Sequence, residues 1–377
     1  MYKRILEERI KHRFFSGKAI ILAGARQTGK TTLITELLKV FKGEEVKRFV
    51  CDNPTDRDFL NNKDLSFLKK LIGKAKFLFI DEGQKVATIG QTLKLLVDHY
   101  RSSLQIIVTG SSSFNLLDST QEALTGRKFV FTLYPLGLGE IYPQKDAMTI
   151  SKSLAELLIY GSYPEIVSAE SFDDKVAVLR ELTSSYLYKD ILELQQIHNC
   201  AVLSGLLKAL ALQIGSEVSY NELSNLLGID KKTVERYIDL LEKNFVIFRL
   251  PPYSGNKRRE ISKLRKIYFY DTGIRNAIIN NFNPPDSRDD TGALWENFMV
   301  AERMKFREYR GVFRNQYFWR TYDGSEVDLV EEESGRLDGF EFKRGSRCRI
   351  RAPASWLANK GASFSVVSPD NLEGFIL

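Results

Sequence analysis

Over residues 1–148, short apolar runs alternate with segments in which apolar residues recur every three or four positions. Short apolar runs between polar residues are typical of buried parallel strands, and the three-to-four spacing is typical of helices. The pattern predicts helices over 30–41 and 91–100, and strands at 18–24, 46–51, 76–81, 104–110 and 128–134. Alternating strands and helices predict an α/β domain with a parallel sheet.

The pattern changes three times after this domain. Residues 149–215 keep the helical spacing without strands, which predicts a helical lid or linker. Residues 216–280 begin with two short helices and end with two strands, whereas residues 288–377 contain alternating, aromatic-rich strands. The polar segment 280–290, with two adjacent prolines, predicts the connection between these last two domains.

A glycine-rich segment follows the first predicted strand and precedes a predicted helix. It matches G-x-x-x-x-G-K-[ST], in which backbone N–H groups and the helix N-terminus face a phosphate. Lys30 is predicted to neutralise the β- and γ-phosphates, and the Thr31 hydroxyl to ligate Mg²⁺. The cofactors expected are therefore ATP and Mg²⁺. The predicted nucleotide-binding residues are Gly24, Ala25, Arg26, Gln27, Thr28, Gly29, Lys30, Thr31 and Thr32.

Two adjacent acids, Asp81 and Glu82, follow the apolar run 77–80. In hydrolysing P-loop proteins an aspartate in this place holds Mg²⁺, and the next carboxylate can take the proton of the attacking water. We predict these roles for Asp81 and Glu82; the alternative is that Glu82 is a solvated acid at a strand end. A small-molecule kinase would not need the acid pair.

Hydroxyl residues end the next predicted strand. Ser111, or else Thr109, is predicted to orient the γ-phosphate or the attacking water, although serine-rich turns also form for local capping reasons. Arg127 follows, and we predict that it reaches the γ-phosphate of a neighbouring subunit; a surface ion pair is the alternative. The carboxyl ends of parallel strands meet at one sheet edge, so these groups should converge.

Composition narrows the cellular setting. The chain has no apolar run long enough to span a bilayer, and its charged N-terminus is unlike a signal peptide, so we expect a cytoplasmic protein without a membrane partner. Its three cysteines lack metal or disulfide spacing. The net charge of +7 favours a polyanionic partner, and basic residues gather at 257–266 and 343–351.

Residues 219–244 have helix-turn-helix spacing. Ser219 and Glu222 can cap the first helix, Gly228 marks the turn, and Lys231 and Arg236 lie near the start of the second helix. Strands at 246–250 and 266–270 flank the basic segment, as in a winged helix. We predict contact with DNA, mainly from this charge; docking of a protein partner is the alternative.

The last predicted domain carries a second set of acids. Asp328 lies on one predicted strand, and Glu341 and Lys343 alternate on the next, a D…E-x-K arrangement that resembles PD-(D/E)xK nucleases. Asp328 and Glu341 are predicted to hold Mg²⁺, Lys343 to steady the water or phosphate, and Glu296 to supply a further acid. The alternative is an ion pair between Glu341 and Lys343 on a solvated sheet face.

The whole chain resembles prokaryotic AAA-type (AAA+) ATPases with an uncharacterised C-terminal domain. The strings that carry the likeness are Gly24–Thr32, Phe79–Gln84, Thr109–Ser112, Gly126-Arg127, Tyr134–Leu136 and Gly161–Glu165. The resemblance implies an oligomeric AAA+ core followed by winged-helix and restriction-endonuclease-like parts. We therefore expect an ATPase coupled to a DNA-binding, nuclease-like module. The alternative is a nucleotide-operated switch or scaffold that binds DNA or protein and cuts nothing.

Overall fold

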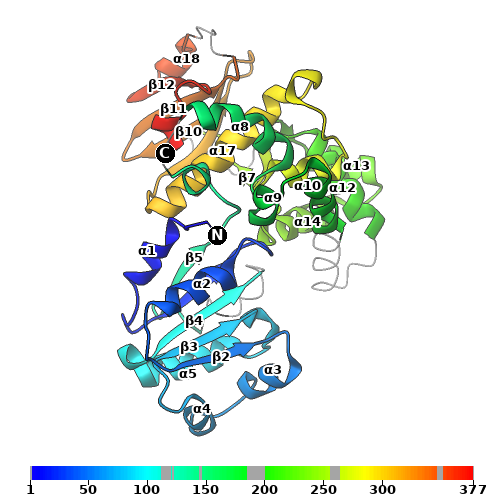
Figure 1. The fold of residues 1–377 in the computed structure, drawn as a ribbon. Coiled ribbons are helices and arrows are strands. Elements are labelled where there is room, and N and C mark those ends of the chain that lie inside the picture. The colour runs from blue at the N-terminus through cyan, green and yellow to red at the C-terminus, as the bar shows by residue number, and fades with distance from the viewer. Residues whose placement is uncertain are drawn as a thin grey trace. The chain divides into compact units, whose positions relative to one another are not determined.

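The computed structural model describes residues 2–111, 120, 123–143, 147–184, 200–254, 264–345 and 351–376 (Figure 1). The chain forms two compact units. The first contains residues 1–135 and 243–245, and the second contains residues 136–242 and 246–377. Each unit has its own sheets and is described separately below.

The first unit is built on a five-stranded parallel sheet in the order β2-β3-β4-β1-β5. Three of its strands, β1, β3 and β4, are buried at every position, because helices cover both faces of a parallel sheet. The five predicted strands are confirmed to within two residues at each end. They are β1 (Ala19–Ala23), β2 (Val46–Val50), β3 (Phe77–Asp81), β4 (Gln105–Gly110) and β5 (Lys128–Thr132).

Two helices of this unit begin at side-chain caps. Asn53 and Asp64 accept hydrogen bonds from the backbone N–H groups of Thr55 and Phe67, which satisfies donors that a helix start leaves unpaired. One apolar core includes Leu68 of a peripheral helix and the sheet residues on its side. The helices are α1 (Leu6–Lys11), α2 (Lys30–Lys39), α3 (Pro54–Leu60), α4 (Leu65–Ile72) and α5 (Ile89–Tyr100), with short 3-10 turns at Gly83–Lys85 and Arg101–Ser103.

The second unit begins with helices, as the sequence predicts. Leu154, Leu157 and Leu158 are buried on one face of α8, and Leu179 is buried on α10. Residues 161–163 separate α8 from α9. These helices are α7 (Leu138–Ile141), α8 (Ala147–Tyr160), α9 (Pro164–Ser168) and α10 (Phe172–Glu181).

A module of three helices and three strands follows. Its sheet has the order β6-β8-β7 with antiparallel pairing, and Ser219 accepts a hydrogen bond from Glu222 N–H at the start of α13. The predicted helices and strands of this region are all present. The elements are α12 (Cys200–Leu212), β6 (Glu217–Val218), α13 (Tyr220–Leu227), α14 (Lys231–Lys243), β7 (Ile247–Leu250) and β8 (Arg265–Phe269). The basic residues Lys257, Arg258, Arg259 and Lys263 lie outside the described residues.

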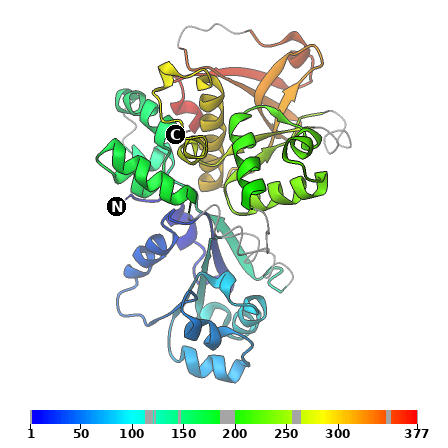
Figure 2. The same cartoon turned by 90° about the vertical axis from the view of Figure 1, so that its right-hand side faces the viewer.

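The C-terminal part is a mixed sheet of order β12-β11-β10-β9. Strands β9, β10 and β11 are antiparallel, β12 is parallel to β11, and α17 contacts both β11 and β8 (Figure 2). A turn at Asp323-Gly324 joins β9 to β10, with Gly324 at φ +90°. The elements are α16 (Thr272–Ile278), a turn at Pro285–Ser287, α17 (Thr291–Arg310), β9 (Asn315–Arg320), β10 (Glu326–Glu333), β11 (Arg336–Phe342), α18 (Ala354–Leu357), β12 (Ala362–Val367) and α19 (Glu373–Ile376).

Two expectations about the whole chain can be compared with these elements. No helix in the described part of the chain is long and apolar enough to cross a bilayer. Cys51 is buried and Cys200 exposed, and both are free thiols; Cys348 lies outside the described residues. The segment 280–290 is mostly exposed, with only Pro285 buried, and its last residue, Asp290, pairs with Arg275 and Arg288.

Candidate functional site

The glycine-rich loop leaves β1 along a path that only glycine allows. Gly24 has φ +153°, and a Cβ atom there would lie 2.1 Å from the carbonyl oxygen of Leu133. Gly29, the residue before α2, has φ +89°. Both positions need a residue without a side chain, so the loop can curl tightly in front of the helix N-terminus.

Lys30 lies within this loop, with 5% of its surface exposed. Its Nζ donates hydrogen bonds to the carbonyl oxygens of Gly24 at 2.8 Å and Ala25 at 2.7 Å. Thr28 Oγ1 also donates to Ala25 O, at 2.9 Å. The ammonium is therefore held above the loop, beside the backbone N–H groups that start α2.

Asp81 ends β3 directly beside the start of α2. Thr31 Oγ1 donates to the Asp81 carboxylate oxygens at 3.0 and 2.9 Å, and Thr109 Oγ1 donates to Asp81 Oδ1. Arg48 Nη2 lies 3.7 Å from Asp81 Oδ2. Strand β4 pairs with both β1, which leads into the loop, and β3, which ends at Asp81. Thr109 of β4 can therefore reach the Asp81 carboxylate. Thr31 and Asp81, the predicted Mg²⁺ ligands, thus lie in direct contact.

Glu82 turns away from β3 in a left-handed backbone conformation, φ +53°, which is rare for a residue other than glycine. Its Oε2 accepts hydrogen bonds from Ser111 Oγ at 2.9 Å and from Gln84 Nε2 at 2.5 Å. Gln84 Nε2 also lies 2.9 Å from Ser111 Oγ. Glu82 is therefore fixed by two side chains rather than free in solvent, and Ser111 is placed beside it.

Arg127 is partly exposed and forms an ion pair within its own unit. Its Nε lies 2.5 Å from Asp98 Oδ1, and this hydrogen bond raises the pKa of Arg127 above its ordinary value. The predicted surface ion pair is therefore present. The role predicted in a neighbouring subunit stays a prediction.

The acids of the C-terminal sheet form a second group. Asp328 lies on β10 at a one-residue register shift between Val327 and Val330, directly before Leu329, which pairs with Phe340 of β11 next to Glu341. Such bulges re-aim side chains and are frequent beside active sites. Asp328 Oδ2 accepts a hydrogen bond from Phe342 N at 2.8 Å. Asp328 and Glu341 are thus neighbours on two central strands.

Glu296 joins this group from α17, where two residues of β8 hold it. Its Oε1 accepts hydrogen bonds from Lys266 Nζ at 2.8 Å and from Tyr268 Oη at 2.6 Å. Lys266 Nζ also pairs with Glu326 of β10. On the far side, Lys343 Nζ lies 2.9 Å from Glu341 Oε1.

Burial makes this group electrostatically costly. Burial, together with the neighbouring carboxylates of Glu296 and Glu341, raises the pKa of Asp328 well above its ordinary value. Burial alone would lower the pKa of Lys266, but Glu296, Glu326 and Asp328 together raise it. The carboxylates therefore stabilise the charged ammonium of Lys266, whereas the raised pKa of Asp328 favours its protonated form.

The match to known families begins in the first unit. Residues 16–142 match the family model described as an AAA domain. Together with the parallel sheet and the loop geometry, this match decides the class. The first unit resembles an AAA-type P-loop domain, and residues 16–142 are called the AAA domain from here on. Residues 151–285 match a domain of unknown function (DUF8612), and residues 291–367 match another domain of unknown function (DUF4143).

Similar chains share most of this length. An uncharacterized protein of Mycobacterium tuberculosis is 28% identical over 346 residues, which is 91% of this chain and 74% of that protein. An uncharacterized protein of Methanocaldococcus jannaschii is 26% identical over 350 residues, 87% of this chain and 75% of that protein. The solved structure of a Walker-type ATPase of Pyrococcus abyssi aligns with a TM-score of 0.47 and 15% identity, over 74% of this chain and 96% of that chain.

Arg4, which precedes the matched AAA domain, also belongs to the nucleotide site. It is buried, and it donates hydrogen bonds from Nη1 to Thr28 O at 2.6 Å and from Nη2 to Tyr134 O at 2.7 Å. It therefore ties the P-loop to the segment after β5. The sequence carries no local signal for this role, because the partners are 24 and 130 positions away.

The environment of Lys266 differs from the one that its basic neighbours in the sequence suggest. It was grouped with basic residues expected to face DNA, but only 2% of it is exposed and its ammonium faces Glu296 and Glu326. The ammonium also lies over the ring of Phe318, 5.6 Å from the ring centre. This lysine is therefore too deeply buried to contact a phosphate backbone.

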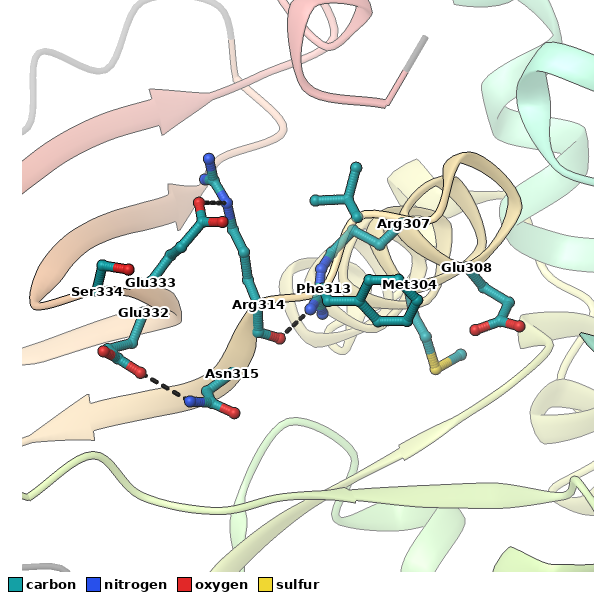
Figure 3. Close-up of a pocket in the computed structure, with 10 residues that line it drawn as sticks. Met304, Arg307, Glu308, Phe313, Arg314, Asn315, Glu332, Glu333 and Ser334 are labelled. Carbon is teal, nitrogen blue, oxygen red and sulfur yellow. Dashed lines mark hydrogen bonds and ion pairs between the residues drawn. The ribbon is translucent and has the colours of Figure 1, made fainter. Parts of the chain in front are cut away.

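A pocket of about 630 Å³ lies between the end of α17 and the β9–β10 strands (Figure 3). Arg307 donates to the carbonyl oxygen of Arg314, Arg314 Nε lies 3.0 Å from Glu333 Oε2, and Asn315 Nδ2 donates to Glu332 Oε2 at 2.7 Å. The described residues that line it include none of the predicted site residues. Arg307 Nε, which is buried, finds no hydrogen-bond partner among the described residues, and the lining holds acids as well as arginines, so we assign the pocket no ligand.

Proposed function

We propose that this chain hydrolyses ATP in its AAA domain and that the nucleotide cycle controls a DNA-binding, nuclease-like C-terminal part. The ATPase proposal rests mainly on one observation: Glu82 is held by Ser111 next to the contact between Thr31 and Asp81. A P-loop that only binds nucleotide does not need a carboxylate fixed in this position. A homo-oligomer, implied by the family resemblance, would be the setting in which Arg127 acts.

The chemistry assigned to these residues is simple. Water attacks the γ-phosphorus, the bond from phosphorus to the bridging oxygen breaks, and ADP and phosphate leave. Lys30 neutralises the phosphate oxygens, and Thr31 and Asp81 would hold Mg²⁺, which screens the charge of the phosphates. Glu82 accepts the proton of the attacking water. Ser111 orients Glu82 through its hydrogen bond.

DNA binding is proposed from the module α12–β8. A helix, a short strand, two helices and two further strands, with β6 paired to β8, form the arrangement expected of a winged helix. Lys231, Lys232 and Arg236 are exposed at the start of α14. Exposed cations on the second helix of such a pair suit phosphate contacts. A protein partner on the same surface remains the competing proposal.

Nuclease activity is proposed from Asp328, Glu341 and Lys343, which share adjacent central strands as a D…E-x-K pattern requires. A metal ion fits these residues because Glu341 Oε2 is buried and finds no hydrogen-bond donor among the described residues. Asp328 and Glu341 would hold the ion, which supplies a Lewis acid for phosphodiester cleavage. Lys343, half-exposed beside Glu341, would face the phosphate.

A specific observation favours the second candidate, a nucleotide-operated switch that cuts nothing. In the described part of the chain, no three His, Cys, Asp or Glu side chains are grouped as metal ligands. The lysines Lys266 and Lys343 already pair with three of the carboxylates. A switch of this kind would keep the fold of a nuclease and use it to bind DNA or protein.

One experiment separates the two. Labelled linear, single-stranded and branched DNA is incubated with Mg²⁺ or Mn²⁺, with and without ATP, using wild type, Glu341→Ala and Lys30→Ala. Cleavage that is lost in Glu341→Ala supports the nuclease, and the Lys30→Ala variant then shows whether nucleotide controls it. Absence of cleavage by wild type, with ATP turnover intact, supports the switch.

A further inference from the structure

Lys266 occupies an unusual position for a lysine. It belongs to β8, yet its Nζ lies between Glu296 of α17 and Glu326 of β10, 2.8 Å from Glu296 Oε1. Tyr268, two residues further on the same face of β8, donates to the same oxygen of Glu296. A buried ammonium with two carboxylate partners is where a cation would be found if the lysine were absent.

The charges around this lysine do not balance. The buried group, which we call the carboxylate cluster, holds more acids than bases among the described residues. Its acids are Glu296, Glu326, Asp328 and Glu341, and its bases are Lys266 and Lys343. Arg320 adds a partial contribution from the rim, at 3.8 Å from Glu326. The cluster therefore offers more carboxyl groups than its two lysines pair with, and carboxylate oxygens are the ligands that hard divalent cations prefer.

The same contacts explain why the acids do not converge as metal ligands. Lys266 draws Glu296 and Glu326 toward itself, while Lys343 holds Glu341. We propose that Lys266 is a built-in cation that closes the carboxylate cluster, so that a divalent metal binds tightly only when the ammonium is removed from between Glu296 and Glu326. This inference rests on the proposed nuclease-like function and names the regulation of that site.

The position of Lys266 in the chain suggests how such a contact could be released. It is the second residue of β8, which directly follows the basic segment of the α12–β8 module. β8 pairs with β6 and β7 of that module, whereas the acids belong to α17 and to the C-terminal sheet. The buried side chain of Asn297 on α17 bonds both N and O of Phe269 and anchors β8, so a movement of the Lys266 side chain itself would withdraw the ammonium and leave Glu296 available to a metal.

The test is direct binding of Mn²⁺ to the full chain by calorimetry or electron paramagnetic resonance, without nucleotide. An Asp81→Asn background removes the metal ligand of the AAA domain. Lys266→Gln is expected to bind Mn²⁺ at least tenfold more tightly than the background chain, and adding Asp328→Asn should abolish that gain. Lys266→Arg, which keeps the positive charge, should bind as weakly as the background.

Matched variants guard against trivial effects. Lys175→Gln removes another buried lysine of the second unit, one that pairs with the single carboxylate of Glu156, and it should leave Mn²⁺ affinity unchanged. If Lys266→Gln alone does not fold, Lys266→Gln with Glu326→Gln removes one charge of each sign. This double variant should still bind Mn²⁺ more tightly than the background.

The outcomes are decisive and independent of the cleavage experiment. Equal affinity in the background and in the folded Lys266 variants, or no binding in any of them, overturns the inference. Tighter binding that persists after Asp328→Asn also overturns it, because the metal would then lie elsewhere. If metal binds as expected but no variant cuts DNA, the nuclease proposal fails and the role of Lys266 stands.

Discussion

The nucleotide site and the carboxylate cluster are built in opposite ways. In the AAA domain the loop backbone and Lys30 form a cationic site, and Lys30 is held by carbonyl oxygens of the same short loop. In the C-terminal part the side chains of Asp328, Glu296 and Lys266 come from three elements and compensate one another's charge. A site made of backbone is readable from a short motif. A site made of distant side chains depends on partners that the motif does not contain.

The sharpest way to test the first half of this comparison is to separate nucleotide binding from hydrolysis. Lys30→Ala should abolish nucleotide binding because the phosphate charge loses its ammonium. Glu82→Gln should keep binding but lower turnover by about 10²–10⁴-fold, the contribution typical of a general base. Binding is measured by fluorescent-nucleotide titration and turnover by phosphate release. Undiminished hydrolysis in both variants would defeat the ATPase proposal.

The backbone contribution can be tested at Gly24. Gly24→Ala should lower the free energy of unfolding by about 2–4 kcal/mol, because the new Cβ would lie 2.1 Å from the Leu133 carbonyl oxygen. Gly43→Ala is the matched control, since Gly43 also has positive φ but has nothing within 4 Å. It should cost only about 1 kcal/mol, the price of the backbone conformation alone. Urea unfolding of both variants measures the difference.

Similar costs for the two alanines would mean that the loop adjusts around Leu133. The tight path after β1 would then be a preference of the free chain, and the claim that only glycine fits would fail. A large difference would confirm that the P-loop is fixed against the strand end.

These contrasts show what the sequence could and could not predict. The three buried strands β1, β3 and β4 follow from apolar runs such as 77–80, because a strand buried on both faces leaves few polar positions. The loop 24–32 is contiguous, so its geometry follows from its glycines. Arg4 was missed because its partners are backbone carbonyls far along the chain, which no residue pattern records.

The carboxylate cluster was predicted only in part. The alternation of Glu341 and Lys343 places them on one face of a strand, and the structure pairs them at 2.9 Å. The pairing of Lys266 with Glu296 joins residues 30 positions apart on different elements. A lysine in a basic stretch is ordinarily solvated, so charge pattern alone assigned Lys266 to the wrong environment.

The electrostatic state of the cluster gives a pH-dependent prediction. The pKa of Asp328 is higher in the folded chain than in the unfolded chain. As pH rises, the unfolded chain therefore loses this proton first. The wild type loses stability as pH rises from the unfolded pKa of Asp328 to its folded pKa. Asp328→Asn does not titrate. It should melt a few degrees above the wild type at pH 8 in EDTA, with the difference vanishing near pH 4. Thermal melts across this range measure it.

The pH dependence of stability that Asp290 contributes has the opposite sign. Hydrogen bonds from Arg288 and Arg275 lower the pKa of Asp290 to about 2, so its stabilising effect is present above the ordinary value and disappears as pH falls toward 2. Asp290→Asn should therefore melt below the wild type at pH 8.

The Asp328 prediction fails if Asp328→Asn also melts below the wild type at pH 8. The neighbouring cations would then fully compensate the buried charge of Asp328.

The smallest expected effect on stability concerns Arg127, whose guanidinium forms a surface ion pair with Asp98. Arg127→Ala should leave the melting temperature nearly unchanged, because exposed ion pairs such as the one with Asp98 contribute little. The intact fold then makes ATP turnover of this variant a clean test of the role predicted in a neighbouring subunit. Turnover should fall in Arg127→Ala but not in Asp98→Asn, which breaks the same ion pair and keeps the guanidinium. Equal turnover in both variants and the wild type, over a range of protein concentrations, would leave Arg127 with only its surface partner.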